Sequence, residues 1–217
     1  MRSSYKNIIF DLDGTLVDSF PGIEESLKYA ISVVDPVLDL SQLRSYIGPP
    51  LSKMLARMWP QKDEVIVNQV IHEFRSDYIK RGCFCSRPFS GVSDLLLQLR
   101  SKNYSLFVLT NKPADPARKI LQHLGWEKHF TEVLSPDAVT PCLTTKTEGA
   151  HLLVQKHSLI AAETILVGDS QDDVTAAQSA GFTFLEASYG YGLCDENVTK
   201  RTWLQLKSPM DLVSILA

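Results

Sequence analysis

A short stretch near the N-terminus constrains the fold most, because an apolar segment runs directly into acidic residues. Residues 8–10 are Ile-Ile-Phe, and Asp11 and Asp13 follow them with no polar transition. A short, continuously apolar run is typical of a central parallel strand whose two faces are both buried. Open α/β sheets bind their ligands at the carboxyl ends of such strands. The sequence therefore predicts an α/β fold that presents two carboxylates at the ligand-binding edge of its sheet.

Two small residues beside these acids support a binding role. Gly14 permits tight backbone geometry and the close approach of a ligand, and Thr15 adds a hydroxyl group. Neighbouring carboxylates repel each other unless a divalent cation or a shared proton lies between them. By itself, however, Asp-Leu-Asp-Gly-Thr is equally compatible with a polar turn, because Asp and Gly are common in turns.

Hydrogen-bonding side chains also follow a second predicted strand. The strand predicted at residues 104–109 is followed directly by Thr110 and Asn111. Their hydroxyl and amide groups can donate to an anion beside the first site. A threonine at this position is also compatible with a simple strand end. The next helix is predicted to begin with Asp115 as its N-cap and Pro116 at its first position.

A further predicted strand leads into more acids. Residues 164–167 are continuously apolar, Asp169 follows them, and Asp173 lies one helical turn further on, so both carboxylates can face one point. A carboxylate run that opens a helix is also compatible with ordinary capping. Added to Asp11 and Asp13, these acids favour a site for a divalent cation.

A lysine is placed to complete an anion site. Thr145 and Glu148 have the spacing of a capping box, which puts Lys146 in the first turn of a helix. A lysine there is slightly unfavourable to the helix dipole, and a bound anion would reverse that penalty. Compared with Lys128 and Lys156, Lys146 is therefore the best candidate to hold an anionic group.

A helical block interrupts the α/β pattern. Helices are predicted at residues 21–33, 40–46, 51–58 and 63–80, before the α/β pattern resumes with a helix at 92–101 and strands that include 132–134 and 182–187. We therefore expect a Rossmann-like, three-layer core with a mostly parallel sheet and an inserted all-α cap. The predicted core comprises residues 1–17 and 86–217, and the predicted cap comprises residues 18–85.

Composition narrows the class of protein. The net charge is −3, which argues against nucleic acid as a partner, and no uncharged apolar run is long enough to span a membrane. The four cysteines lack the spacing of a zinc site and are expected to be reduced thiols, which fits a cytoplasmic enzyme. A monomer and a homodimer are both compatible with the sequence.

The polar segments together resemble the signatures of one enzyme family. These are the run Phe-Asp-Leu-Asp-Gly-Thr-Leu-Val-Asp-Ser, the run Leu-Thr-Asn-Lys-Pro, the acidic segment that begins Val-Gly-Asp-Ser, and the loop Tyr-Gly-Tyr-Gly at residues 189–192. Their order and spacing resemble the haloacid dehalogenase superfamily, in particular its phosphoglycolate phosphatase-like branch. One position departs from that pattern, since Thr147 follows Lys146 where close members often have proline.

The resemblance implies a mechanism and roles for the acids. Asp11 would be the nucleophile that forms an aspartyl-phosphate, and Asp13 would be the general acid and base. The metal would be Mg²⁺, held by Asp11, the backbone carbonyl of Asp13 and Asp169, with Asp173 orienting these ligands. The predicted substrate is a small phosphorylated metabolite, a phosphoglycolate-like monoester.

The resemblance also implies which residues bind the substrate. The predicted set comprises Gly14, Thr15, Thr110, Asn111 and Lys146 in the core, with Arg44 and Gly48 in the cap. Gly48 lies in a Gly/Pro-marked loop at residues 47–51, between two predicted cap helices. In the resembling family, a loop of this kind helps to choose the substrate. A sugar phosphomutase, a pyrophosphatase or a nucleotidase of the same fold would use the same acids. A non-catalytic binding protein is disfavoured, because Asp11 and Asp13 are both present.

Overall fold

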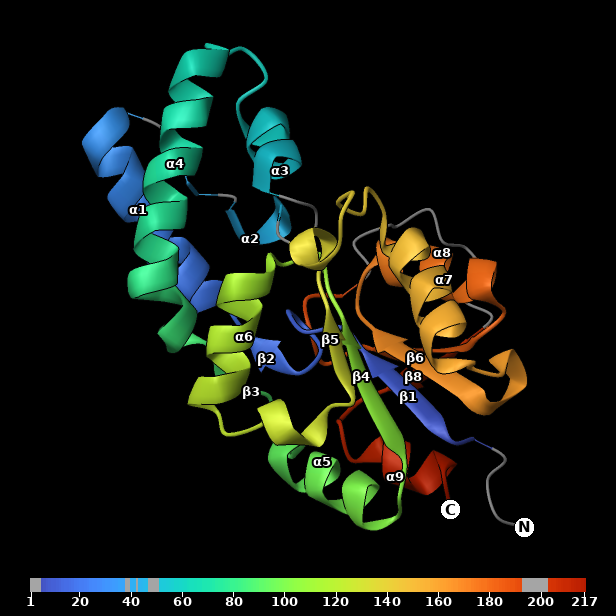
Figure 1. Cartoon of the computed structure of the whole chain (residues 1–217). Helices are drawn as coiled ribbons and strands as arrows, with labels where there is room; N and C mark the ends of the chain where they lie inside the picture. The colour runs from blue at the N-terminus through green and yellow to red at the C-terminus, as the bar shows by residue number, and fades with distance from the viewer. Residues whose placement is uncertain (1–4, 38–39, 42, 47–50, 193–202) are drawn as a thin grey trace. The chain divides into compact units, whose positions relative to one another are not determined.

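The structure of the chain is a computed structural model. It describes residues 5–37, 40–41, 43–46, 51–192 and 203–217 (Figure 1). The chain divides into two compact units. The first unit combines Met1–Asp18 with Pro88–Ala217, and the second unit is Ser19–Arg87.

The first unit is built on a six-stranded sheet with the order β5-β4-β1-β6-β7-β8. The strands are β1 (Asn7–Phe10), β4 (Ser105–Leu109), β5 (Glu132–Leu134), β6 (Thr164–Gly168), β7 (Thr183–Ala187) and β8 (Leu204–Leu206). All five neighbouring pairs are parallel. The prediction of an α/β core with a mostly parallel sheet is therefore confirmed. Strand β8 was not predicted from the sequence.

The apolar side chains of the central strands are buried on both faces, as the continuous apolar run predicted. Ile9 lies in register with Phe107 of β4 and Leu166 of β6, and all three join one buried cluster with α7 and α8. Ile8 and Leu106 are also fully buried, and successive strand residues point to opposite faces. The sheet is therefore a middle layer, and its carboxyl edge is the part that can present polar groups.

Helices flank these strands along the chain. They are α5 (Val92–Ser101), α6 (Ala114–His123), α7 (Lys146–His157), α8 (Gln171–Ala180) and α9 (Asp211–Ile215), with short 3₁₀ turns η2 (Glu127–His129), η3 (Pro136–Ala138) and η4 (Ala161–Glu163). Helices α7 and α8 pack side by side against the sheet (Figure 1). The short strands β2 (Val17–Asp18) and β3 (Arg87–Pro88) form a separate two-stranded sheet.

The second unit is helical in its described part. It contains α1 (Phe20–Val34), α2 (Leu43–Tyr46), α3 (Leu51–Met58), α4 (Glu64–Lys80) and the 3₁₀ turn η1 (Gly82–Cys85). Helices α1 and α4 lie side by side and share a buried polar contact, in which Ser26 Oγ donates to Asp77 Oδ2 at 2.8 Å. Arg81 pairs with the other oxygen of Asp77 at 2.6 Å. The second unit is therefore held together internally by the packing of α1 against α4 and by the ion pair between Arg81 and Asp77.

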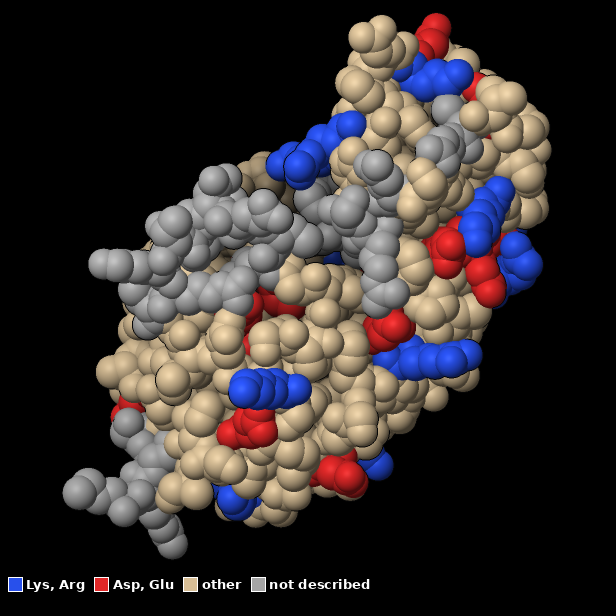
Figure 2. Space-filling view, turned by 180° about the vertical axis from the view of Figure 1, so that it is seen from behind, with Lys and Arg blue, Asp and Glu red and all other residues tan. Residues whose placement is uncertain are grey.

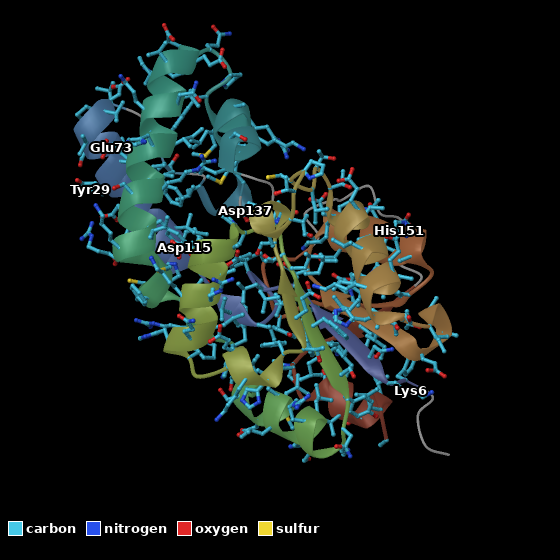
Figure 3. The ribbon with its side chains drawn as sticks, viewed as in Figure 1. Lys6, Tyr29, Glu73, Asp115, Asp137 and His151 are labelled. Atoms are coloured by element: carbon cyan, nitrogen blue, oxygen red, sulfur yellow. The ribbon has the colours of Figure 1, made fainter. Side chains whose placement is uncertain are left out.

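One predicted helix start is wrong. Helix α6 begins at Ala114 with Pro113 as its N-cap residue, so Asp115 lies inside the first turn. The carboxylate that accepts from Ala114 N at 2.8 Å is Asp137 Oδ1, which comes from η3 (Figure 3). A side chain distant in sequence thus supplies the cap, and Asp115 pairs instead with Lys119.

Two features concern possible partners: the distribution of charged side chains on the surface and the length and hydropathy of the helices. Figure 2 shows acidic and basic side chains interspersed on the described part of the face that it displays. None of the described helices is both long enough and apolar enough to cross a membrane.

Candidate active site

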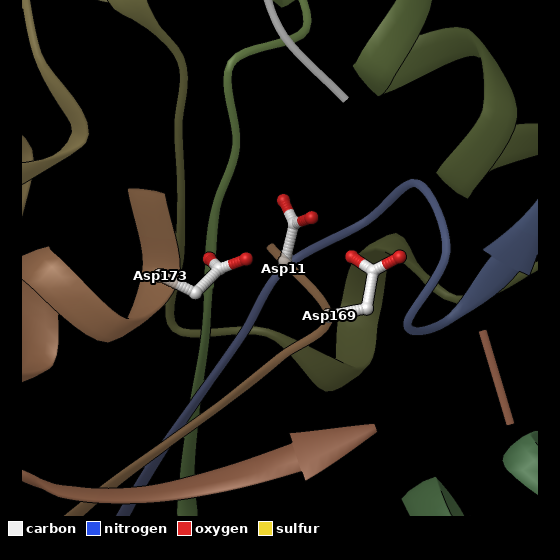
Figure 4. A group of neighbouring side chains, drawn as sticks. All are labelled: Asp11, Asp169 and Asp173. Atoms are coloured by element: carbon white, nitrogen blue, oxygen red, sulfur yellow. The ribbon is translucent and has the colours of Figure 1, made fainter. Parts of the chain in front are cut away.

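Three carboxylates converge at the carboxyl edge of the sheet. Asp11 directly follows β1, and its backbone N–H donates to Val167 O at 2.9 Å, so the strand geometry continues to the acid itself. Asp169 follows the neighbouring strand β6, and Asp173 lies in the first turn of α8. Oxygen atoms of the three side chains lie within 4.8 Å of one another, and all three residues are buried (Figure 4).

Lys146 lies in the same cluster. It is the first residue of α7, and Thr145 is the N-cap residue whose hydroxyl accepts from Glu148 N at 3.2 Å. Its Nζ lies 2.8 Å from Asp11 Oδ1 and 2.7 Å from Asp173 Oδ1, and its side chain is only 2% exposed. The first turn of α7 thus delivers an ammonium group directly to two of the carboxylates.

Asp173 serves both as a helix cap and as a partner of the site. Ser170 is the N-cap residue of α8, and its backbone N and Oγ both donate to Asp173 Oδ2, completing a capping box. The other oxygen of Asp173 binds Lys146. Gly168 makes room for this carboxylate, because a Cβ there would lie 2.2 Å from Asp173 Cγ. Asp173 therefore caps helix α8 and also belongs to the carboxylate cluster.

The cluster carries unbalanced negative charge. Three carboxylates and one ammonium sum to −2 when all are ionised. Burial, assisted by the charge of Asp173, raises the pKa of Asp11 to about 7, although Lys146 acts to lower it. Burial and the charges of Asp11 and Asp173 also raise the pKa of Asp169. Burial acts to lower the pKa of Lys146, but Asp11 and Asp173 outweigh it and raise that pKa, so Lys146 stays charged.

The donor set fits a divalent cation that prefers oxygen ligands. A +2 ion would neutralise the net charge of −2, and the three side chains offer only carboxylate oxygens. Mg²⁺ in proteins needs one or two carboxylates and otherwise keeps water. The residues present are therefore compatible with Mg²⁺.

A loop after β7 holds Asp169 in place. Tyr191 N donates to Asp169 Oδ2 at 3.0 Å, and Tyr191 Oη donates to Asp18 Oδ1 at 3.0 Å. Gly14 adopts φ +82°, and a Cβ at that position would lie 2.0 Å from Asp169 Oδ2. A glycine is therefore required both for the backbone conformation and for the close approach of Asp169.

Asp13 lies near the cluster but has a different partner. Its Oδ2 accepts from Lys112 Nζ at 2.9 Å, and the Lys112 side chain is only 6% exposed. Lys112 belongs to the run Leu-Thr-Asn-Lys-Pro, but no role was predicted for it from the sequence. Its position two residues after Thr110, at the carboxyl end of β4, was the signal available in the sequence.

The remaining predicted core residues lie at the same edge with different contacts. Thr110 is buried, and its Oγ1 accepts from Lys112 N at 3.1 Å. Asn111 Nδ2 donates to Asp172 Oδ2 at 2.8 Å, so its amide binds the start of α8. Thr15 is fully buried, and its hydroxyl has no hydrogen-bond partner among the residues that the structure describes.

The two cap residues predicted from the sequence cannot be placed at the site. Gly48 and the side chain of Arg44 lie outside the described residues.

The fold and the site define a class of protein. A parallel α/β sheet whose carboxyl edge presents buried carboxylates and a buried lysine suits an enzyme that acts on an anionic substrate with a divalent cation. The family model described as "Haloacid dehalogenase-like hydrolase" matches residues 8–187, and the chain belongs to this family.

Relatives of the chain are named for different activities. A 5'-nucleotidase of Pseudomonas aeruginosa is 31% identical over 195 residues, which cover 88% of this chain and 86% of the relative. A phosphoglycolate phosphatase of Vibrio cholerae is 31% identical over 196 residues, which cover 87% and 86%. The solved structure of the Mycobacterium tuberculosis Protein Tyrosine Kinase A is 30% identical, covers 98% of each chain and gives a TM-score of 0.82.

These relationships confirm the predicted superfamily and its phosphoglycolate phosphatase-like branch. The chain is thus an enzyme of the class that hydrolyses phosphoric monoesters.

Proposed function

We propose that this protein is a Mg²⁺-dependent phosphatase that hydrolyses a small phosphomonoester, such as phosphoglycolate, through an aspartyl-phosphate. The observation that carries this proposal is the placement of Asp11. It is a buried carboxylate directly after the central strand, 2.8 Å from the ammonium of Lys146 and within 4.8 Å of two further carboxylates. Such a group is held rigidly by the sheet and is surrounded by charges suited to phosphoryl transfer.

The first step transfers the phosphoryl group to the protein. An Asp11 oxygen attacks phosphorus, and the bond between phosphorus and the ester oxygen breaks with its electron pair going to that oxygen. Asp13 donates a proton to the departing oxygen, so that an alcohol leaves.

The second step restores the protein. A water molecule attacks the phosphorus of the aspartyl-phosphate, and Asp13, now ionised, takes a proton from that water. The bond between phosphorus and the Asp11 oxygen breaks, which releases inorganic phosphate and regenerates both acids in their starting states.

The other groups of the site hold charge. Asp11, Asp169 and the backbone carbonyl of Asp13 would hold Mg²⁺, while Asp173 orients the site by holding Lys146. When bound, Mg²⁺ supplies positive charge that offsets the repulsion between an anionic nucleophile and an anionic phosphate. Lys146 and Thr110 would hold the phosphoryl oxygens, on which charge is spread in the transition state.

Three further residues at the same edge of the sheet are assigned to substrate binding. Asn111 would assist in phosphate binding, and Gly14 and Thr15 would provide close backbone and hydroxyl contact. We assign substrate choice to a cap formed by residues 18–85, including Arg44 and Gly48, and catalysis to a core formed by residues 1–17 and 86–217. The enzyme would act in the cytoplasm as a monomer or a homodimer.

A nucleotidase is the second candidate, because a relative that covers most of the chain is a 5'-nucleotidase. The same acids would cleave a nucleoside monophosphate, and only the leaving group differs. A phosphomutase or a pyrophosphatase of the same fold would differ in its products: an isomerised sugar phosphate, or two phosphates for each pyrophosphate.

The first experiment measures phosphate release from p-nitrophenyl phosphate by wild type, Asp11→Asn and Asp115→Asn, with MgCl₂ and with EDTA. We expect metal-dependent release by wild type and by Asp115→Asn, whose carboxylate lies outside the cluster. Asp11→Asn should lose the activity, because an amide cannot form the acyl phosphate. Retained activity in that variant would exclude the aspartyl-phosphate.

A substrate panel then separates the candidates. It should contain phosphoglycolate, nucleoside monophosphates, hexose phosphates, pyrophosphate, and ATP with a tyrosine peptide. Preference for phosphoglycolate supports the proposal, and preference for a nucleotide would favour the nucleotidase. Phosphate transfer to the peptide or to a second sugar hydroxyl would contradict simple hydrolysis.

A further inference from the structure

A second buried lysine divides the charges of the site into two groups. Lys146 contacts Asp11 and Asp173, at 2.8 and 2.7 Å. Lys112 contacts Asp13 Oδ2 at 2.9 Å. The proposed nucleophile and the proposed acid therefore each have an ammonium partner. One ammonium group comes from the first turn of α7 and the other from the turn after β4.

The backbone around Lys112 is fixed by the sheet. Thr110 N donates to Leu134 O at 3.1 Å, which extends the pairing between β4 and β5 beyond the last residue of β4. Lys112 N in turn donates to Thr110 Oγ1 at 3.1 Å. The lysine therefore starts from a short turn that is anchored to the central strands, and its side chain is almost fully buried.

Lys112 binds one of the two oxygens of the Asp13 carboxylate. Its other oxygen, Oδ1, is buried and has no hydrogen-bond partner in the described part of the chain. Without the ammonium group, neither oxygen of this carboxylate would have a hydrogen-bond partner among the described residues to oppose its rotation. A general acid works only when it lies within hydrogen-bond reach of the atom that it protonates.

We propose that Lys112 is a positioning residue that holds the Asp13 carboxyl group toward the oxygen of the leaving alcohol. This inference rests on the proposed phosphatase function and on the role of Asp13 within it. Lys112 acts through Asp13, whereas Lys146 acts directly on the transferring group.

A positioning role for Lys112 predicts a dependence on the leaving group, which a role limited to balancing the charge of the site does not predict. Protonation of the leaving oxygen matters most for alkyl phosphates, since an alkoxide is a poor leaving group, and least for aryl phosphates, since a nitrophenolate leaves without a proton. Loss of Lys112 should therefore harm alkyl esters selectively. A purely structural role would harm both kinds of ester equally.

The experiment compares kcat/KM for p-nitrophenyl phosphate and for the alkyl phosphate that wild type cleaves fastest. The parameter kcat/KM reports the first phosphoryl transfer, so it excludes the later hydrolysis of the aspartyl-phosphate. The variants are Lys112→Met, which keeps the length without the charge, Lys112→Arg, which keeps a cation, and Lys119→Met, a matched control on α6.

We expect Lys112→Met to lose on the order of 10²-fold in kcat/KM for the alkyl ester, comparable to the low end of general acid catalysis, and only a few-fold for the aryl ester. Lys112→Arg should give a ratio between those of wild type and Lys112→Met. Lys119→Met should match wild type for both esters.

A double-mutant cycle tests whether the effect passes through Asp13. In an Asp13→Asn background, Lys112→Met should cost little further activity toward the alkyl ester, because the two residues act as a unit. Full additivity would overturn the proposal, as would equal losses on both esters. If Lys112→Met does not fold, Lys112→Gln and Lys112→Arg give the same ratio test.

The outcome also separates this inference from the function on which it rests. A wild-type protein that cleaves neither ester overturns the phosphatase proposal and the role of Lys112 together. An active wild type that is abolished by Asp11→Asn, but whose Lys112 variants show no leaving-group selectivity, overturns only the role of Lys112.

Discussion

Replacing Asp169 by asparagine should separate stability from metal binding. Asp169 is 4% exposed, and its carboxylate lies among Asp11, Asp173 and Lys146. An asparagine oxygen can still accept from Tyr191 N, which donates to Asp169 Oδ2 at 3.0 Å. The substitution therefore removes a charge while keeping the shape and the loop contact. Without metal, we expect the variant to be more stable than wild type.

The magnitude follows from the spacing of the carboxylates. Two unit charges 4.8 Å apart repel by about 3.5 kcal/mol at an effective dielectric constant of about 20. Asp169 faces two such neighbours, but Lys146 attracts it and Asp11 is partly protonated near pH 7. A gain of about 1–3 kcal/mol in the free energy of unfolding therefore remains for the metal-free Asp169→Asn variant.

The assay is thermal and urea unfolding with EDTA and with MgCl₂, at an ionic strength matched with NaCl. Mg²⁺ at 100 times its dissociation constant should stabilise wild type by about 2.7 kcal/mol, and Asp169→Asn should lose most of this increment. Asp172→Asn is the matched control. Asp172 lies in the same acidic segment, binds Asn111 and is outside the cluster, so that variant should keep the wild-type response.

Two results would refute this reasoning. One is a metal-free Asp169→Asn protein that is clearly less stable than wild type, which would mean that the carboxylate charge stabilises the fold. The other is an undiminished Mg²⁺ increment in the variant, which would mean that the cation binds elsewhere.

Three further predictions concern the same unit. Gly14→Ala should abolish phosphatase activity and the Mg²⁺ increment in unfolding assays, because φ is +82° and the new Cβ would lie 2.0 Å from a cluster carboxylate oxygen. The affinity for Mg²⁺, measured by calorimetry, should fall as the pH drops through about 7, because the raised pKa of Asp11 lets protons compete with the cation. Burial acts to raise the pKa of Glu132, but Lys156 and His157 outweigh it and hold that pKa below its ordinary value of 4.5. Glu132→Gln should therefore cost about 1 kcal/mol in urea unfolding at pH 7, and the cost should vanish as the pH falls from 4.5 through the lower folded-state pKa.

The strands and the acids at their ends could be predicted from sequence because their signals are local. The run from Ile8 to Phe10 has no polar residue, so it had to be covered on both faces, and Asp11 comes next in the chain. Lys146 was identified in the same way, since the cap residue Thr145 fixes where α7 begins. Each of these inferences used residues within one turn or one strand.

The contacts that sequence could not reveal are those between distant segments. The cap of α6 comes from Asp137, 23 residues beyond the helix start, and no local rule selects it over Asp115. Lys112 and Asp13 are 99 residues apart, and they meet only because β4 and β1 are neighbours in the sheet. Strand β8 has two exposed residues out of three, so it lacks the apolar run that marked the other strands.

The burial of Asp11 has two opposite effects on its proposed role as a nucleophile. Burial protects a nucleophile from water, but it also raises the pKa of this carboxyl group to about 7, and a protonated carboxyl does not attack phosphorus. Lys146 opposes that rise through a contact of 2.8 Å, yet the ionised cluster still carries a charge of −2. A divalent cation would cancel the remainder, so the same ion that screens the phosphate would also keep Asp11 ionised. In the proposed mechanism, the bound cation would therefore raise the ionised fraction of Asp11 at neutral pH, which would tie activity to metal more tightly than phosphate binding alone requires.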